Sequence, residues 1–87
     1  MEVRMSEEML EALRGTPEIP DNLRARVEGA AADGGEFLVT LDDEEQIAMT
    51  EMCEWYVRKD PETGELTSQG KIFDEIVQRV IDADMAR

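Results

Sequence analysis

Apolar and polar positions follow helical spacing most clearly in the last part of the chain, up to Met85. If this part is helical, one face of the helix is apolar and acidic or other polar residues take the opposite face. The apolar face consists of Ile72, Phe73, Ile76, Val77, Val80, Ile81 and Ala83. Thr67 or Ser68 can cap the helix at its N-terminus. The pattern therefore predicts a C-terminal amphipathic helix.

A second amphipathic helix is predicted to begin at Thr40. Thr40 and Asp43 have the spacing of a capping box, and the acidic run at 42–45 suits the positive end of the helix dipole. The apolar side chains of this helix cover a broad face, made of Leu41, Ala48, Met49, Met52, Cys53, Trp55 and Tyr56. A face of this width is typical of a helix that contacts two neighbours.

The segment after this helix allows two interpretations. In the first, the helix leads into a turn at 60–64, with the sequence Asp-Pro-Glu-Thr-Gly, and the two helices form a hairpin. In the second, the helix ends near Glu54 and residues 55–67 form a small β-hairpin. The second interpretation rests on the β-prone residues at 55–57 and on the turn sequence, which is common at hairpin tips.

Two shorter helices are predicted in the N-terminal part. The first covers residues 5–14, with Ser6 as its N-cap and Gly15 ending it in a left-handed conformation. Its apolar stripe consists of Met5, Met9, Leu10 and Leu13. Two prolines in the connector at 16–20 then prevent a continuous helix.

The second short helix is predicted to begin at Asp21 and to continue to about Ala32, where Gly34 and Gly35 end it. Its inward-facing residues are Leu23, Val27 and either Ala30 or Ala31.

Residues 36–41 are the one strand candidate in the pattern. They are β-prone but do not alternate cleanly, and no second strand of comparable strength is evident. A single strand cannot satisfy its own backbone hydrogen bonds, so the segment is either an extended linker or a strand that pairs across a dimer. Of these two interpretations, the pattern favours the first, in which residues 35–41 form an extended linker.

The fold class expected from these elements is mainly α. It is a small bundle of three to four helices organised on the C-terminal helical hairpin, with a short extended or β segment at 36–40 as the single exception. The 87 residues allow one domain. Within it, residues 1–34 carry the N-terminal helices and the proline-containing connector, residues 35–41 form the linker, and residues 42–87 form the helix–turn–helix pair.

The net charge of the chain limits the classes of partner that it can bind. Asp and Glu number 22 against 9 Lys and Arg, which gives a net charge of −13. Such a chain repels nucleic acids and anionic membranes, because binding to either needs positive charge. No apolar stretch approaches the ~20 residues that span a bilayer, and the first ten residues lack the features of a signal peptide. A cytoplasmic location is expected.

Catalytic chemistry has few candidates in this composition. The chain has no histidine, which removes the usual general base near neutral pH and every Ser-His or Cys-His pair. The single cysteine, Cys53, has no neighbouring cation in the sequence to activate it and cannot form a zinc site alone. The protein is therefore predicted not to be an enzyme and to hold no cofactor or metal.

The loop from Asp60 to Lys71 lies between two predicted helices, as a calcium-binding loop would. Position six of such a loop is glycine and position twelve is a bidentate glutamate, whereas this chain has Glu65 and Lys71 there. The loop is therefore interpreted as structural. Size and acidity are similar to those of acyl carrier proteins, but their Asp-Ser-Leu sequence is missing, and Ser68 stands in Thr-Ser-Gln-Gly instead.

Binding to another protein remains as the predicted function. Large aromatic and thioether side chains are enriched at interfaces, and four of them cluster on the second predicted amphipathic helix. These candidate partner-binding residues are Met49, Met52, Trp55 and Tyr56. The alternative for the same four residues is a place in the core.

Two versions of this function are open. In the first, the protein is a small acidic accessory or regulatory factor that contacts another protein or a second copy of itself. A homodimer would then use Trp55 or the face of Ile76 and Val80 as its interface. In the second, the protein is an acidic inhibitor that mimics nucleic-acid charge, as antitoxins or phage inhibitors can, and binds a basic protein through the carboxylates at 42–45.

Overall fold

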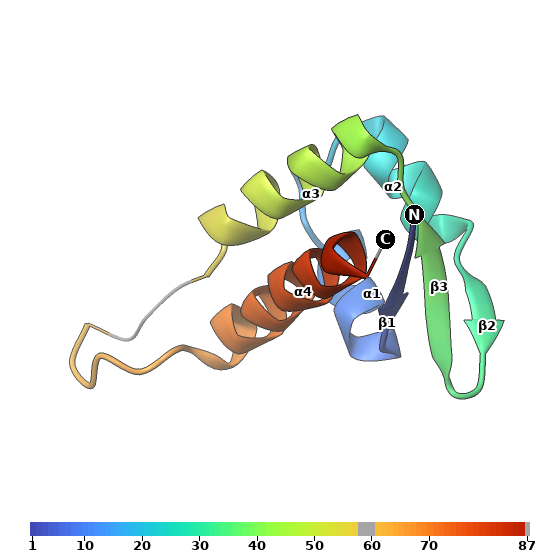
Figure 1. The fold of residues 1–87 in the computed structure, drawn as a ribbon. Coiled ribbons are helices and arrows are strands. Elements are labelled where there is room, and N and C mark those ends of the chain that lie inside the picture. The colour runs from blue at the N-terminus through green and yellow to red at the C-terminus, as the bar shows by residue number, and fades with distance from the viewer. Residues whose placement is uncertain (58–60, 87) are drawn as a thin grey trace.

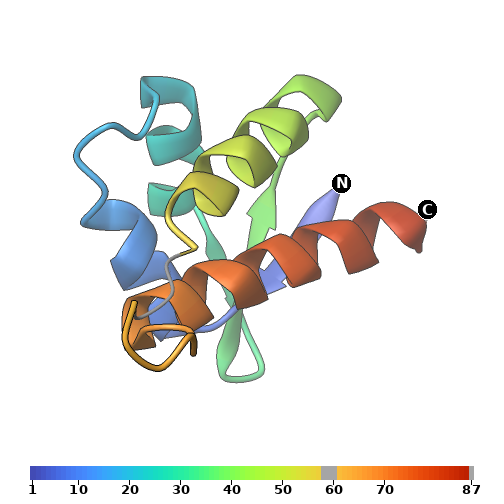
Figure 2. The same ribbon diagram turned by 90° about the vertical axis from the view of Figure 1, so that its left-hand side faces the viewer.

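The structure is a computed structural model that describes residues 1–57 and 61–86. In these ranges the chain forms three strands and four helices, in an order that begins with a strand (Figure 1). They are β1 (Glu2–Met5), α1 (Glu7–Arg14), α2 (Asp21–Glu28), β2 (Ala31–Asp33), β3 (Glu36–Thr40), α3 (Asp43–Trp55) and α4 (Ser68–Met85). The helices lie on one side of a small sheet (Figure 2). The fold is therefore mixed α and β. The four helices agree with the expected mainly α class, but the expectation of a helical bundle with a single short extended or β segment is corrected, because three strands form a sheet.

The strand β3 is the centre of the sheet, so the β segment allowed at 36–40 is confirmed and the favoured interpretation of residues 35–41 as a linker is wrong. The strand order is β1-β3-β2 and both pairings are antiparallel, with Val3 opposite Val39 and Ala31 opposite Leu38. Both partners of β3 come from segments without a strong β signal of their own. Pairing on two sides satisfies the backbone of β3 within one chain, so no second copy is needed for it.

The hairpin between β2 and β3 replaces the end of the second predicted helix. Helix α2 stops at Glu28 with Gly29 as its C-cap, and the alanines expected to extend it form an edge strand. Gly34 and Gly35 have φ values of +59° and +88°. Two residues with positive φ are what a tight two-residue hairpin of matching twist requires.

The sheet buries one face and leaves the other to solvent. Val3, Met5 and Val39 point toward the helices and are buried, whereas Arg4 on the opposite face is exposed. Arg4 reaches across β3 to the far edge strand, where its Nη2 lies 2.8 Å from Oδ2 of Asp33. The alternation of β3 is unclear in the sequence because Leu38, an apolar residue, stands on its solvent face. Leu38 is in register with Arg4 on one side and with Ala31 on the other.

Helix α4 packs against three other elements, β1, α1 and α3 (Figure 2). Its predicted apolar face is confirmed in its central part. Phe73, Ile76, Val77 and Val80 are buried, and Ile81 at the edge remains 39% exposed. Ile76 and Val80 are completely covered by the chain itself, so this face is core and not free surface.

The N-cap of helix α3 lies two residues later than expected, at Asp42 and not at Thr40. Asp42 is the N-cap: its Oδ1 accepts from the backbone N–H of Glu45 at 2.8 Å, and Oε1 of Glu45 accepts from the N–H of Asp42 at 3.0 Å. This reciprocal capping box replaces the one expected between Thr40 and Asp43. Thr40 cannot cap the helix because it is paired with Glu2 in the sheet.

The C-terminal end of α3 agrees with the interpretation that the helix stops near Glu54. The last helical residue is Trp55, and Tyr56 is the C-cap. The hairpin and the turn proposed beyond it include residues 58–60, which lie outside the described residues. Within the described part, residues 61–63 form a turn, and Gly64 follows with a φ of +74°.

The first helix matches its prediction with one correction at each end. Ser6 is the N-cap, with its Oγ accepting from the N–H of Met9 at 3.3 Å. Met5, expected in the helix, belongs to β1 instead. Gly15 ends the helix as expected, but with a right-handed φ of −79° and not a left-handed conformation.

Candidate protein-binding surface

The four candidate binding residues are separated by the structure. Met49 is fully buried in the core, and Tyr56 stacks on Phe73 with ring centroids 5.1 Å apart and an interplanar angle of 28°. Met52 is half-buried, whereas Trp55 is 70% exposed. The core alternative is therefore correct for Met49, and a surface remains around Trp55.

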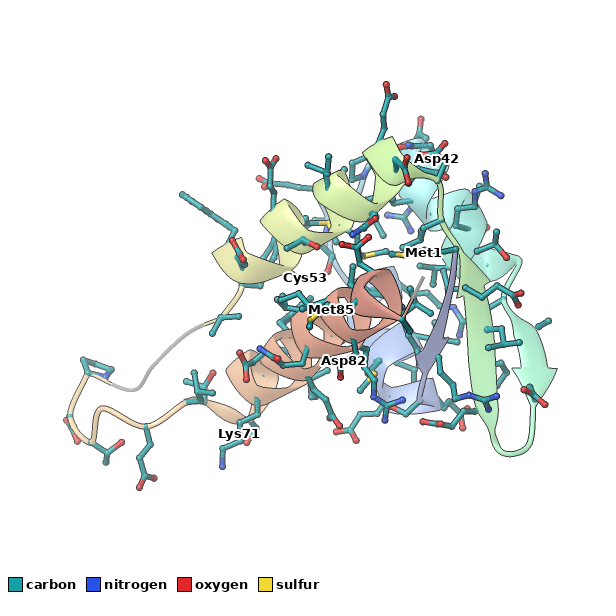
Figure 3. All side chains as sticks on the ribbon, in the orientation of Figure 1. Met1, Asp42, Cys53, Lys71, Asp82 and Met85 are labelled. Carbon is teal, nitrogen blue, oxygen red and sulfur yellow. The ribbon has the colours of Figure 1, made fainter. Side chains whose placement is uncertain are left out.

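The broad apolar face of α3 is divided between the core and solvent. Its inner half carries Met49 and Cys53, both buried, and Cys53 lies on the side turned toward α4 (Figure 3). Its outer half carries Ala48, Met52 and Trp55 at positions i, i+4 and i+7, a stripe about 10 Å long. The excess width of the face thus produces an apolar stripe that no element of the described chain covers completely.

A groove of about 380 Å³ runs along this stripe, and we call it the Trp55 groove. One wall is the outer half of α3 and the other is the connector between α1 and α2. Its lining residues are Glu18, Pro20, Ala48, Glu51, Met52, Trp55 and Tyr56. Sequence periodicity indicates the contributions from α3, but no sequence signal joins Glu18 and Pro20 to a helix that begins more than twenty residues later.

A second groove of about 440 Å³ lies between α1 and the first half of α4, and we call it the α1–α4 groove. It is lined by Glu8, Glu11, Ala12, Gly15, Thr16, Pro17, Tyr56, Gln69, Ile72 and Phe73. Tyr56 lines both grooves, so the two grooves are adjacent at this residue. The stacking on Phe73 holds its ring in place.

The rims of both grooves are acidic. Glu8 and Glu11 line the α1–α4 groove, and Glu18 and Glu51 line the Trp55 groove. All four are exposed, and within residues 1–57 and 61–86 none of them forms an ion pair. Among residues 1–57 and 61–86, no Lys or Arg lines either groove.

The acidic run at the start of α3 is partly used by the fold. Glu45 is only 5% exposed and accepts from Nε of Arg26 at 3.1 Å and from the backbone of Asp42. The hydrogen bond from Arg26, followed by that from Asp42, lowers the pKa of Glu45 below its usual value, while Glu45 raises the pKa of Arg26. Two of the four carboxylates proposed to mimic nucleic acid are therefore structural.

The candidate chemical groups of the sequence are Cys53 and the carboxylates. Cys53 is completely buried, and burial raises the pKa of its thiol to about 12, so the thiol is neutral near pH 7 and inaccessible to a substrate. Among the residues that the structure describes, no group of three or more Cys, Asp or Glu side chains is placed to hold a metal ion. The calcium-type loop begins at Asp60, outside the described residues. No described helix is both long and apolar enough to cross a membrane.

Comparison with protein-family models, with curated proteins and with solved structures gives no match for this chain. The function of the surface is therefore argued from its own geometry.

Proposed function

We propose that this protein is a non-catalytic accessory or regulatory factor that binds another protein at the Trp55 groove. The observation that carries the proposal is the position of Trp55, which is 70% exposed at the end of α3 beside Met52 and Tyr56. Tryptophan and tyrosine are the residues most enriched at the centres of protein interfaces.

The energetic argument concerns how little of Trp55 the fold uses. An aromatic side chain of this size buries ~150–250 Å², at about 25 cal/mol per Å². Because 70% of the residue is exposed, a partner that covers Trp55 would gain about 3 kcal/mol of free energy from burying it. A contribution of this size is typical of a binding hot spot.

A non-catalytic role is supported by the chemistry of the chain. The 87 residues include no histidine, and the only thiol is buried and neutral. The grooves have volumes near the low end of the ~300–1,000 Å³ found for ligand pockets, and both are open at the surface. Open apolar grooves with acidic rims suit a protein segment better than a small substrate.

The nucleic-acid mimic is not the function that we propose. It was expected to present the carboxylates at 42–45 together, but Asp42 caps α3 and Glu45 is buried against Arg26. Binding by charge alone would also leave the exposed apolar stripe on α3 without a role.

The test is capture of partners from the native host by the wild-type protein and by two variants. Trp55→Ala removes the proposed anchor, and Ile47→Ala is its matched control, since Ile47 is also an exposed apolar residue of α3 (59%) but lies outside both grooves. We expect a partner that the wild type and Ile47→Ala retain and that Trp55→Ala loses. Identical partners for all three proteins would contradict the proposal.

A further inference from the structure

We propose that the two grooves form one continuous surface across Tyr56, and that this surface binds a cationic segment with apolar anchors on a partner protein. This inference rests on the proposed function and adds the chemical class of the partner. It depends on three features: the shared lining residue Tyr56, the apolar floors of the grooves, and the unpaired carboxylates at their rims.

The continuity of the surface comes from Tyr56. Tyr56 is a lining residue of the Trp55 groove and of the α1–α4 groove, so the two grooves are adjacent at this residue. Its ring is held by stacking on the buried Phe73, with ring centroids 5.1 Å apart. A segment bound across Tyr56 reaches apolar surface in both grooves at once.

The floors of the two grooves are apolar and can adapt to their ligand. Met52 and Ala48 supply the floor beside Trp55, and Ile72 and Phe73 supply the floor between α1 and α4. Met52 is unbranched and half-buried, so its side chain can adjust to different anchors. Two separated apolar sites favour a segment with two apolar side chains over a single anchor.

The charges at the rims of the grooves indicate which charge the bound segment carries. Glu8 and Glu11 lie three residues apart on α1, so they share one face of the helix, and Glu18 and Glu51 stand on either side of the Trp55 groove. None of these four carboxylates has an ion-pair partner in the described chain. Lys or Arg side chains that flank the apolar anchors would complement them.

The same charges argue against a second copy as the occupant. Two copies related by a symmetry axis through Tyr56 would bring eight rim carboxylates together, with no cation among the described residues that line the grooves. Each copy also carries a net charge of −13, which opposes association at low ionic strength. A cationic segment meets attraction from the rims and from the whole chain.

The experiment uses a synthetic amphipathic peptide of lysine and leucine, about 14 residues long so that it can form a helix. Two peptides of the same length serve as controls: one of lysine and serine, which keeps the charge, and one of glutamate and leucine, which keeps the anchors. Binding is measured through the fluorescence of Trp55, the only tryptophan of the chain. We expect the Lys–Leu peptide to shift the Trp55 emission to shorter wavelength and the two control peptides to have little effect.

Paired charge variants locate the binding on the surface. Glu18→Gln with Glu51→Gln removes two rim charges, and Glu28→Gln with Glu44→Gln removes two exposed charges outside both grooves. We expect the first pair to weaken binding of the Lys–Leu peptide about fivefold and the second pair to change it by less than about twofold. Equal effects of both pairs would show general charge attraction and would overturn the inference.

The remaining outcomes separate this inference from the proposed function. If the Lys–Leu peptide fails to bind, or the Glu–Leu peptide binds as well, the cationic class is wrong, while Trp55-dependent capture of a host partner would still support the proposed function. If sedimentation shows a dimer that Trp55→Ala dissociates, the occupant is a second copy and the inference is overturned. If host capture does not depend on Trp55, the proposed function itself fails.

Discussion

Arg26 and Glu45 join α2 to the first turn of α3: Nε of Arg26 lies 3.1 Å from each of the two carboxylate oxygens of Glu45. The same carboxylate also accepts the backbone N–H of Asp42 at 3.0 Å, so one buried side chain closes the capping box and holds two helices together. This contact ties the first turn of α3 to α2, while the rest of α3 packs on α4.

The Glu45 contact predicts a specific dependence of stability on pH. The hydrogen bonds from Arg26 and Asp42 lower the pKa of Glu45 in the folded state below its usual value of 4.5. A lowered folded pKa means that the stabilisation is fully present above about pH 4.5 and is lost as the pH falls through the folded pKa. Urea unfolding at several pH values should therefore show Glu45→Gln well below the wild type at pH 7, with the gap closing in acid.

The matched control for this prediction is Glu44→Gln, which changes a neighbouring exposed carboxylate of the same helical turn. Its stability should follow that of the wild type across the whole pH range. A constant gap between Glu45→Gln and the wild type would mean that ionisation of Glu45 does not contribute to stability.

Cys53 should behave as a reporter of unfolding. It is fully buried, and burial raises its thiol pKa to about 12 from the usual value of 9.0. A thiol reagent should react with the native protein only as fast as the chain opens, and rapidly in denaturant. Because the folded pKa is raised, stability should also fall by about 1.4 kcal/mol per pH unit above about pH 9. Fast labelling under native conditions would place the thiol at the surface.

The β2–β3 hairpin predicts that two glycine substitutions have unequal effects on the stability of the protein. Gly34 and Gly35 have positive φ values, and a Cβ added at either would meet nothing within 4 Å, so only backbone conformation decides the outcome. Gly35→Ala should destabilise the protein by about 1–2 kcal/mol. Gly34→Asn should be close to neutral, because Asn is preferred at the first position of such a turn. Thermal unfolding of the two variants checks the prediction, and equal losses would exclude this turn geometry.

Periodicity predicts some elements of this fold better than others. Helix α4 was predictable because Phe73, Ile76 and Val80 repeat at helical spacing over several turns, and the repeat matches the buried face. The strand β1 has an alternating pattern as well, with Val3 and Met5 buried, but four residues are too few to separate from a helix start. Its stability as a strand comes from β3, more than thirty residues away, and local patterns do not contain that pairing.

The Gly-Gly pair is the signal that could have identified the hairpin. The sequence pattern places this pair at the end of a helix that reaches about Ala32, and alanine favours helices. The tertiary pairing of Ala31 with Leu38 overrides this preference. In the same way, residues 40–45 contain two overlapping capping-box patterns, Thr40 with Asp43 and Asp42 with Glu45, and pairing of Thr40 in the sheet decides which one forms.

The candidate surface was predictable only in its α3 half. Trp55 and Met52 stand out by residue type and spacing, whereas Met49, one turn away, is equally conspicuous in the sequence and belongs to the core. A helical wheel shows a wide apolar face but not where the core ends on it. The opposite wall, with Glu18 and Pro20, depends on how the connector folds back.

The most direct test of the central claim compares the stability and the partner binding of Trp55→Ala with those of Met49→Ala. If the Trp55 groove is a binding surface, Trp55→Ala should lose its partner but only about 1–2 kcal/mol of stability, from the part of the residue that the fold buries. Met49→Ala, which removes a fully buried side chain, should lose about 2–5 kcal/mol of stability. A Trp55→Ala variant as unstable as Met49→Ala, or one that keeps every partner of the wild type, would contradict the account.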